Sequence, residues 1–141
     1  LEVQDVDLQE RSITIRPNSI RGLKTKGSHR TLPLSQRAAG TLQEHRKGKE
    51  NGEAIFSKYA RPRGNDAASA MLMKRLRRAI TDKKLTMHSL RHRMKDKLRN
   101  TGCPEAISMA ILGHGSNTVA ANYGSGYALD VMREHMEKVW S

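Results

Sequence analysis

The sequence is poor in the residues that mark several common classes of protein. It has one cysteine, one tryptophan and one phenylalanine, and aromatic side chains make up 4% of its 141 residues. A single cysteine cannot close a disulfide within the chain and is typical of a reducing compartment. These shortages exclude a disulfide-stapled secreted domain, and they leave no aromatic platform on which an RNA-binding module could stack bases.

Long apolar runs and acidic residues are also scarce. No apolar stretch approaches the roughly 20 residues that a membrane-spanning helix needs, so we expect no membrane span, no secretion signal and a cytoplasmic location. The 26 lysines and arginines outnumber the 14 acidic residues and give a formal charge of +12. Such an excess predicts a polyanionic partner, and we expect nucleic acid before a membrane surface.

The N-terminal residues predict two β-hairpins. Residues 1–16 alternate loosely between apolar and polar side chains around a polar centre at 9–11, as two short antiparallel strands do. A second hairpin is predicted from Leu23-Lys24-Thr25 and residues 30–34, with Gly27 supplying the positive φ of its turn.

Helical patterns fill most of the remaining chain. The segment 89–100 carries Leu90, Met94 and Leu98 at a helical spacing, which predicts one buried stripe. Further helices are predicted at 35–47, 66–80, 104–112 and 128–140, with a short one carrying Tyr123, and Ala54-Ile55-Phe56 is predicted to insert into the core. The pattern therefore predicts an α+β domain, mainly helical, with a small antiparallel sheet near its N-terminus.

The predicted helix at 66–80 is strongly basic. Its cationic residues lie largely opposite its apolar ones and could form an ordinary solvated face. In a chain of this charge we favour contacts with phosphates, because clustered cations on one helix face are typical of backbone binding. The cations are Lys74, Arg75, Arg77 and Arg78.

The stretch from His88 to Tyr123 carries the candidate chemistry. His88 and Arg91 lie three residues apart, so a helix places both on one face. His114 and Tyr123 lie nine apart, which leaves room for a turn and a short helix to return the hydroxyl to the imidazole. His88 and His92 have helical spacing but lack the intervening glutamate of a zinc motif, so we expect no metal.

These residue types suit one kind of reaction. A tyrosine hydroxyl becomes a nucleophile when a base or a positive charge assists it. An arginine fork fits phosphate oxygens, while lysine and histidine can transfer protons near neutral pH. The set predicts phosphoryl transfer through a covalent phosphotyrosine, with cationic side chains in place of a metal.

In this order the residues resemble the tyrosine recombinase, or phage integrase, family. His88-Ser-Leu-Arg91-His92, Leu112-Gly113-His114 and Tyr123 are similar to its signature. Residues 24–34, Lys-Thr-Lys-Gly-Ser-His-Arg-Thr-Leu-Pro-Leu, are similar to its lysine-bearing hairpin, and Asp5-Val-Asp7 resembles the segment after its first catalytic arginine. The resemblance covers nearly the whole chain.

The resemblance implies the role of each residue. Tyr123 attacks the scissile phosphate, Arg91 and His114 bind its non-bridging oxygens, and His88 assists proton transfer at the nucleophile. Lys24 is our choice for the general acid, with Lys26 as the alternative because the hairpin register is not fixed by the sequence. No cofactor and no small-molecule substrate are implied. The residues predicted to contact double-stranded DNA are Lys26, Arg30, Lys74, Arg75, Arg78 and Arg93.

The resemblance also implies how the chain is divided. Residues 1–141 are expected to be a catalytic-domain fragment, with hairpins at 1–34, a helical core at 35–127 and a C-terminal helix at 128–141. The family's first arginine lies upstream of Leu1, so we expect a fragment of a prophage or other mobile-element enzyme that is weak or inactive alone. Its last helix could pack on its own domain or dock on a neighbour in a tetramer.

Two other functions would share part of this pattern. A relative that binds DNA without cutting it would share the basic surface. A type IB topoisomerase would share the chemistry without joining two sites, although the short hairpin and the Leu-Gly-His motif favour a recombinase. Cys103, next to Pro104 at a predicted helix start, is interpreted as a structural thiol.

Overall fold

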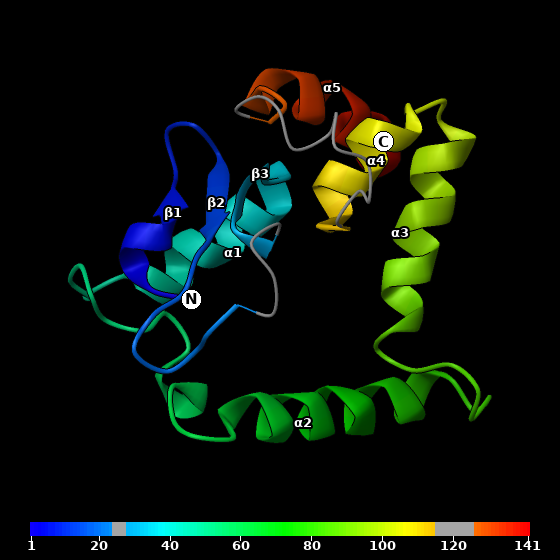
Figure 1. The fold of residues 1–141 in the computed structure, drawn as a ribbon. Coiled ribbons are helices and arrows are strands. Elements are labelled where there is room, and N and C mark those ends of the chain that lie inside the picture. The colour runs from blue at the N-terminus through cyan, green and yellow to red at the C-terminus, as the bar shows by residue number, and fades with distance from the viewer. Residues whose placement is uncertain (24–27, 115–125) are drawn as a thin grey trace.

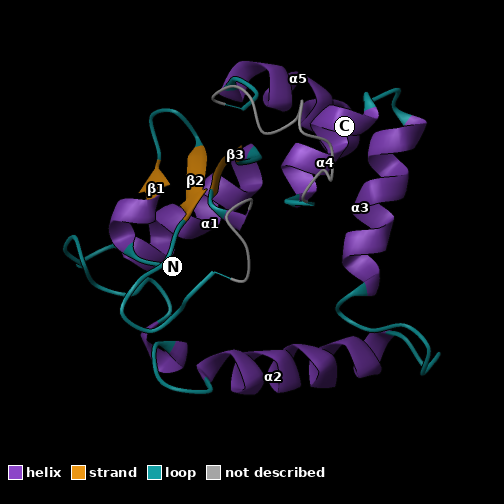
Figure 2. Cartoon of the chain, viewed as in Figure 1, coloured by secondary structure: helices purple, strands orange, loops and turns teal. Residues whose placement is uncertain are grey.

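A computed structural model describes residues 1–23, 28–114 and 126–141 (Figures 1 and 2). It confirms a mainly helical α+β fold with one small antiparallel sheet. The described elements are the 3-10 helix η1 (Val3–Asp5), the strands β1 (Val6–Asp7), β2 (Ser12–Ile15) and β3 (Arg30–Pro33), the helix α1 (Gln36–Arg46), the 3-10 helix η3 (Ser57–Tyr59), and the helices α2 (Gly64–Ala79), α3 (Ser89–Asn100), α4 (Glu105–Leu112) and α5 (Leu129–Trp140).

The sheet has the order β1-β2-β3, and both pairs are antiparallel. The first predicted hairpin is confirmed, because Val6 of β1 lies opposite Ile13 of β2. On the other side of β2, Thr14 lies opposite Thr31, and their hydroxyl oxygens are 3.0 Å apart. Each residue of β3 thereby gains a partner in the central strand.

The second predicted hairpin is wrong for Leu23, which belongs to no strand. Strand β3 pairs with β2. The side chain of Asn18 accepts hydrogen bonds from the backbone of Ile20 and Arg21, at 3.0 and 2.8 Å. Because this local turn occupies those donors, the chain before Leu23 does not continue as a strand. Lys24 and Thr25 of the predicted strand, and Lys26 and Gly27 of the predicted turn, lie outside the described residues.

Interactions between residues close in the sequence define the start of α1 and the end of α3. Ser35 caps α1, since its hydroxyl accepts a hydrogen bond from the backbone nitrogen of Ala38 at 3.2 Å. The bounds of α3 agree with the prediction, and Gly102 follows it with a φ of 73°. These interactions span a few residues, which is why the sequence alone located them.

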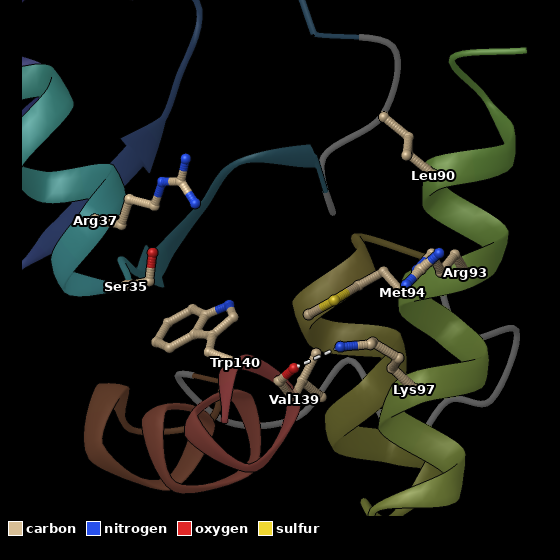
Figure 3. A pocket seen from close by; sticks show the side chains of 8 residues that line it. All are labelled: Ser35, Arg37, Leu90, Arg93, Met94, Lys97, Val139 and Trp140. Atoms are coloured by element: carbon tan, nitrogen blue, oxygen red, sulfur yellow. Dashed lines mark hydrogen bonds between the residues drawn. The ribbon is translucent and has the colours of Figure 1, made fainter. Parts of the chain in front are cut away.

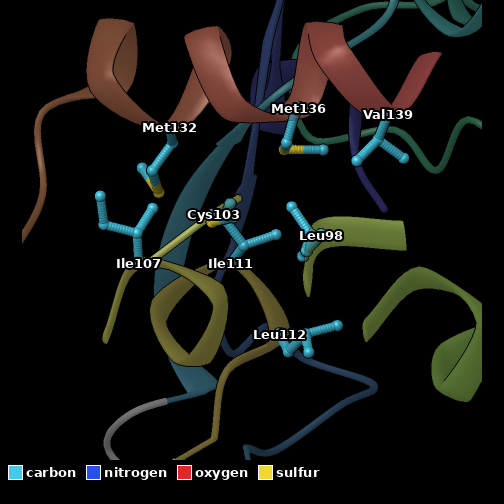
Figure 4. Close-up of a cluster of buried hydrophobic side chains, with 8 residues drawn as sticks. All are labelled: Leu98, Cys103, Ile107, Ile111, Leu112, Met132, Met136 and Val139. Carbon is cyan, nitrogen blue, oxygen red and sulfur yellow. The ribbon is translucent and has the colours of Figure 1, made fainter. Parts of the chain in front are cut away.

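The main core lies where α3, α4 and α5 meet (Figure 4). Leu98 at the centre is fully buried, and Leu32 of β3 packs against the cluster from the sheet side. Cys103 is one of its members, and its thiol is buried. The cluster is formed by Leu98, Cys103, Ile107, Ile111, Leu112, Met132, Met136 and Val139. It fixes the C-terminal end of α4 relative to β3 and α3.

The last helix packs on its own chain. Met132, Met136 and Val139 of α5 lie in the main core, at the spacing of one helix face. Val131, by contrast, is 38% exposed, because it lies one residue before Met132 and therefore points about 100° away from it. The packing corresponds to the first of the two arrangements considered for this helix.

A second, smaller core joins the N-terminal elements. It contains Val3, Val6, Leu42 and Ile55. The apolar insertion is therefore correct for Ile55 and wrong for Phe56, which is 41% exposed. Phe56 makes a T-shaped contact with the His45 ring, with ring centroids 5.4 Å apart, at the surface rather than in the core.

Helix α2 and the start of α3 lie outside both cores. In Figure 1, α2 runs along one edge of the molecule, and within it only Gly64 is buried. Leu90 was predicted to belong to the buried stripe of α3, yet it is 53% exposed. The N-terminal half of α3 extends beyond α4, so the stripe is covered only from Met94 onward.

This difference along α3 gives a direct test of the core. Replacing Leu98 by alanine is expected to lower the free energy of unfolding by about 2–5 kcal/mol, because it empties a fully buried site. The matched change of Leu90 to alanine removes the same atoms from an exposed position and should cost less than about 1 kcal/mol. Urea unfolding followed by circular dichroism measures both, and equal losses would contradict this packing.

Candidate active site

Helix α3 presents the predicted arginine to the end of α4. Arg91 is half-buried, and its guanidinium donates a hydrogen bond to the carbonyl of Leu112 at 2.5 Å. His88 lies one turn earlier at the N-terminal cap of α3, and the backbone nitrogen of Arg91 donates to its carbonyl at 3.0 Å. The guanidinium is therefore oriented by a main-chain acceptor that belongs to the Leu-Gly-His motif.

The Leu-Gly-His motif forms the C-terminal end of α4. Gly113 adopts a left-handed conformation with a φ of 65°, which reverses the chain after Leu112. The backbone nitrogen of His114 donates to the carbonyl of Met109 at 2.9 Å, so this turn is closed by a main-chain bond. His114 is thus held at a helix end that the main core fixes in place.

A third cation, Arg30 of β3, reaches the same helix end. Its Nε donates to the carbonyl of Ile111 at 3.2 Å, and its NH1 donates to the carbonyl of Ser28 at 3.0 Å. Arg30 and Arg91 therefore hold adjacent carbonyls of α4. The negative end of a helix favours positive charge, which explains how two guanidinium groups can be held there.

We call Arg30, Arg91 and His114 the cationic cluster. Desolvation and the charge of Arg91 lower the pKa of Arg30. Desolvation lowers the pKa of His114, and the charges of Arg91, Lys95 and Arg30 lower it further. Among the described residues no carboxylate forms an ion pair with any member of the cluster. Such a site suits a bound anion, which would supply the negative charge that no described carboxylate provides.

The lowered pKa of His114 is measurable. We expect its imidazole to titrate below the ordinary value of about 6.5, because desolvation and the neighbouring positive charges disfavour its protonated form. The unfolded chain then binds the proton more readily than the folded chain does. Lowering the pH through the imidazole pKa should therefore reduce the free energy of unfolding. Imidazole signals in an NMR titration, assigned with His114→Gln, give the midpoint, and Arg91→Gln should raise it. A midpoint at or above 6.5 would contradict the electrostatics described here.

Other predicted site residues lie apart from the cluster or outside the described chain. The exposed His88 ring lies edge-on to the His92 ring, with centroids 4.9 Å apart. Lys24, Lys26 and Tyr123 fall outside the described residues. Their assignment to the site remains a prediction from the sequence.

The predicted DNA contacts differ in their surroundings. Lys74, Arg75 and Arg78 of α2 are exposed and form no hydrogen bond or ion pair with the rest of the described chain. Arg93 of α3 is exposed as well. Arg77, by contrast, donates to the carbonyls of Asp82, Lys83 and Leu85 and so closes the loop after α2.

Sequence reasoning missed two members of the surroundings of His114. Arg30 was interpreted as a DNA contact, and no local pattern connects it with a helix end 81 residues away. Lys95 was not singled out, although it follows Arg91 by four residues and so lies on the same helix face. The helical spacing was therefore a usable signal for Lys95 alone.

A separate groove of about 410 Å³ lies between the start of α1, α3 and α5 (Figure 3). Lys97 crosses it and donates to the carbonyl of Val139 at 2.9 Å. No member of the cationic cluster lines it, so it is distinct from the candidate active site. Its lining residues are Ser35, Arg37, Leu90, Arg93, Met94, Lys97, Val139 and Trp140.

The described residues contain no group of three histidine, cysteine or acidic side chains arranged to hold a metal ion. In the same part of the chain, none of the helices has the length and apolar character needed to cross a membrane.

Comparison with known proteins identifies the family of this chain. Comparison with curated proteins and with solved structures gives no significant match. The profile described as the phage integrase family matches residues 1–128, a range that contains both arginines and the histidine of the cluster. Because this match spans most of the sequence, the chain belongs to the phage integrase family.

Proposed function

We propose that this chain supplies catalytic residues for cutting and rejoining double-stranded DNA at specific sites through a covalent 3′-phosphotyrosine, and that on its own it is weakly active or inactive. The observation that carries the proposal is the cationic cluster, in which Arg91 and His114 are held at one helix end with no described carboxylate to neutralise them. A phosphate diester is the anion that such a site suits, and family membership makes DNA its source.

In the proposed reaction the Tyr123 oxygen attacks the phosphorus, and its proton passes toward His88. The bond between phosphorus and the 5′ oxygen breaks as Lys24, or Lys26 in its place, protonates that oxygen. Arg91 and His114 donate hydrogen bonds to the non-bridging oxygens, where charge accumulates in the transition state. One phosphodiester is exchanged for another phosphate ester, so the 5′ hydroxyl of a second strand can reverse the step without ATP.

The partners follow from the same proposal. We propose that the protein works on DNA as a homotetramer, in the cytoplasm of a bacterial host, and that it serves a prophage or another mobile element. In the structure α5 packs on its own chain, so assembly through this helix would require it to exchange its position in the main core.

The test is covalent trapping. A nicked duplex carrying the element's own attachment site is mixed with this chain, or with a version extended upstream, in the presence of EDTA. A denaturing gel should show a protein–DNA adduct, and protease digestion should leave a peptide containing residue 123 on the 3′ end. If neither form gives an adduct while both bind the duplex, the chain is a DNA-binding module without the chemistry proposed here.

The exposed cations of α2 should contribute to DNA affinity. Changing Lys74, Arg75 and Arg78 together to glutamine should reduce the slope of log affinity against log salt by about 2–3, since each phosphate contact contributes about 0.9. Fluorescence anisotropy with a labelled duplex at several salt concentrations measures the slope. A control removes three exposed cations elsewhere, Arg37, Lys47 and Lys138. Equal losses in both variants would show that α2 contributes only net charge.

A further inference from the structure

Arg30 links two parts of the chain that the sequence keeps far apart. Its side chain bonds the carbonyl of Ser28 near its own strand and the carbonyl of Ile111, 81 residues away, at the end of α4. It is half-buried, so these bonds are partly shielded from water. With two of its nitrogens engaged by main-chain acceptors, this side chain differs from the freely exposed cations of α2.

The guanidinium also packs directly on the turn that precedes His114. A Cβ atom added at Gly113 would overlap the NH1 and Cζ atoms of Arg30. Gly113 is favoured here by its positive φ, and a larger residue would also have to displace the guanidinium of Arg30 from its place. Arg30 and the Gly113-His114 turn are therefore in direct contact.

This arrangement has an electrostatic cost. Arg30 lies near a second guanidinium, that of Arg91, and both its burial and that charge lower its pKa. No carboxylate in the described chain offsets the repulsion. Neutral side chains could join β3 to α4 without this cost, so the arrangement suits a site that an anion completes.

We propose that Arg30 is a positioning residue of the cleavage site, an inference that rests on the function proposed above. Its guanidinium holds the end of α4 against β3. The carbonyl of Leu112 that orients Arg91, and the turn that carries His114, are thereby fixed relative to each other. Arg30 then acts on the scissile phosphate through Arg91 and His114, rather than as one more contact to the DNA backbone.

The test compares two changes at Arg30 with the same changes at Arg37, which is exposed on α1 and outside the cluster. Arg30→Lys keeps the charge but loses the fork that reaches two carbonyls, while Arg30→Gln also loses the charge. The measurements are the single-turnover rate of adduct formation at saturating DNA, the dissociation constant, and the pKa of His114 by NMR. They are made with the form of the protein that gives the adduct, either this chain or the version extended upstream. The temperature is kept at least 10 °C below the melting temperature of each variant.

Both Arg30 variants are expected to form the adduct at least tenfold more slowly at saturating DNA, with a dissociation constant within about threefold of the unaltered protein. Arg30→Gln should also raise the pKa of His114, which a loss of general stability would not do. The Arg37 variants should match the unaltered protein. If Arg30→Gln does not fold, Arg30→Lys, which keeps the charge, decides the question.

Two results would overturn the proposal while leaving the function in place. An unchanged rate at saturating DNA with weaker binding would make Arg30 an ordinary DNA contact. An unchanged rate and unchanged binding would leave it without a role in the reaction. If the unaltered protein itself gives no adduct that depends on Tyr123, the proposed function fails, and this inference fails with it.

Discussion

Replacing Tyr123 by phenylalanine is expected to abolish the covalent adduct and to leave the dissociation constant for DNA within about twofold. The change removes one oxygen atom, which is the proposed nucleophile, and keeps the aromatic ring. Attack by water in place of the tyrosine would cut the strand without joining protein to DNA, so the loss of the adduct should be complete rather than partial. Denaturing gels measure the adduct, and fluorescence anisotropy measures the binding.

Tyr127 supplies the matched control, because it is 43% exposed and lies four residues further along the chain. Tyr127→Phe removes the same atom and should leave the adduct unchanged. An adduct that persists in Tyr123→Phe and disappears in Tyr127→Phe would move the nucleophile to residue 127. An adduct that persists in both would exclude the phosphotyrosine mechanism.

Replacing Arg91 by alanine is expected to slow adduct formation by about 10²–10³-fold at saturating DNA, the usual effect of removing one donor that stabilises a developing oxyanion. Arg91 is proposed to contact the phosphate where charge accumulates, so the loss should fall on the rate more than on affinity. Arg91→Lys should recover only a minor part of the rate, because a lysine keeps the charge but cannot offer two parallel donors. Single-turnover trapping gives the rate, and titration gives the dissociation constant.

The control for Arg91 is Arg99 on the same helix. Its side chain is exposed and lies 3.9 Å from the carboxylate of Asp96, away from the cationic cluster. Arg99→Ala should leave the rate at saturating DNA unchanged. A similar loss in both variants would indicate damage to α3, whereas a rate unaffected by Arg91→Ala would remove Arg91 from the proposed chemistry.

The Tyr123 and Arg91 variants test different parts of the proposed cleavage mechanism. Tyr123 lies outside the described residues, so its assignment depends on the sequence motif and on the trapping experiment. Arg91 is described in full, and its bond to Leu112 explains why the His-Ser-Leu-Arg and Leu-Gly-His motifs belong to one site. A result that supports Arg91 but not Tyr123 would keep the phosphate-binding cluster and change the nucleophile.

The sequence by itself determined the features that depend on neighbours along the chain. The helices, the Ser35 cap and the glycines after α3 and α4 were predictable, because a cap or a helix face involves residues three or four apart. The same holds for the motifs that indicate the family, since they are defined by residue type and spacing. The first hairpin was predictable because its strands are separated by four residues.

Only the tertiary structure decided which distant segments meet. The pairing of β3 with β2, the exposure of Leu90 and the bond from Arg30 to Ile111 depend on contacts between segments far apart in the chain. A periodic pattern shows that a helix has an apolar face but not how much of it a neighbour covers. For the same reason the cationic residue type of Arg30 was readable from the sequence, whereas its place beside Gly113 and Arg91 followed from the packing of β3 against the end of α4.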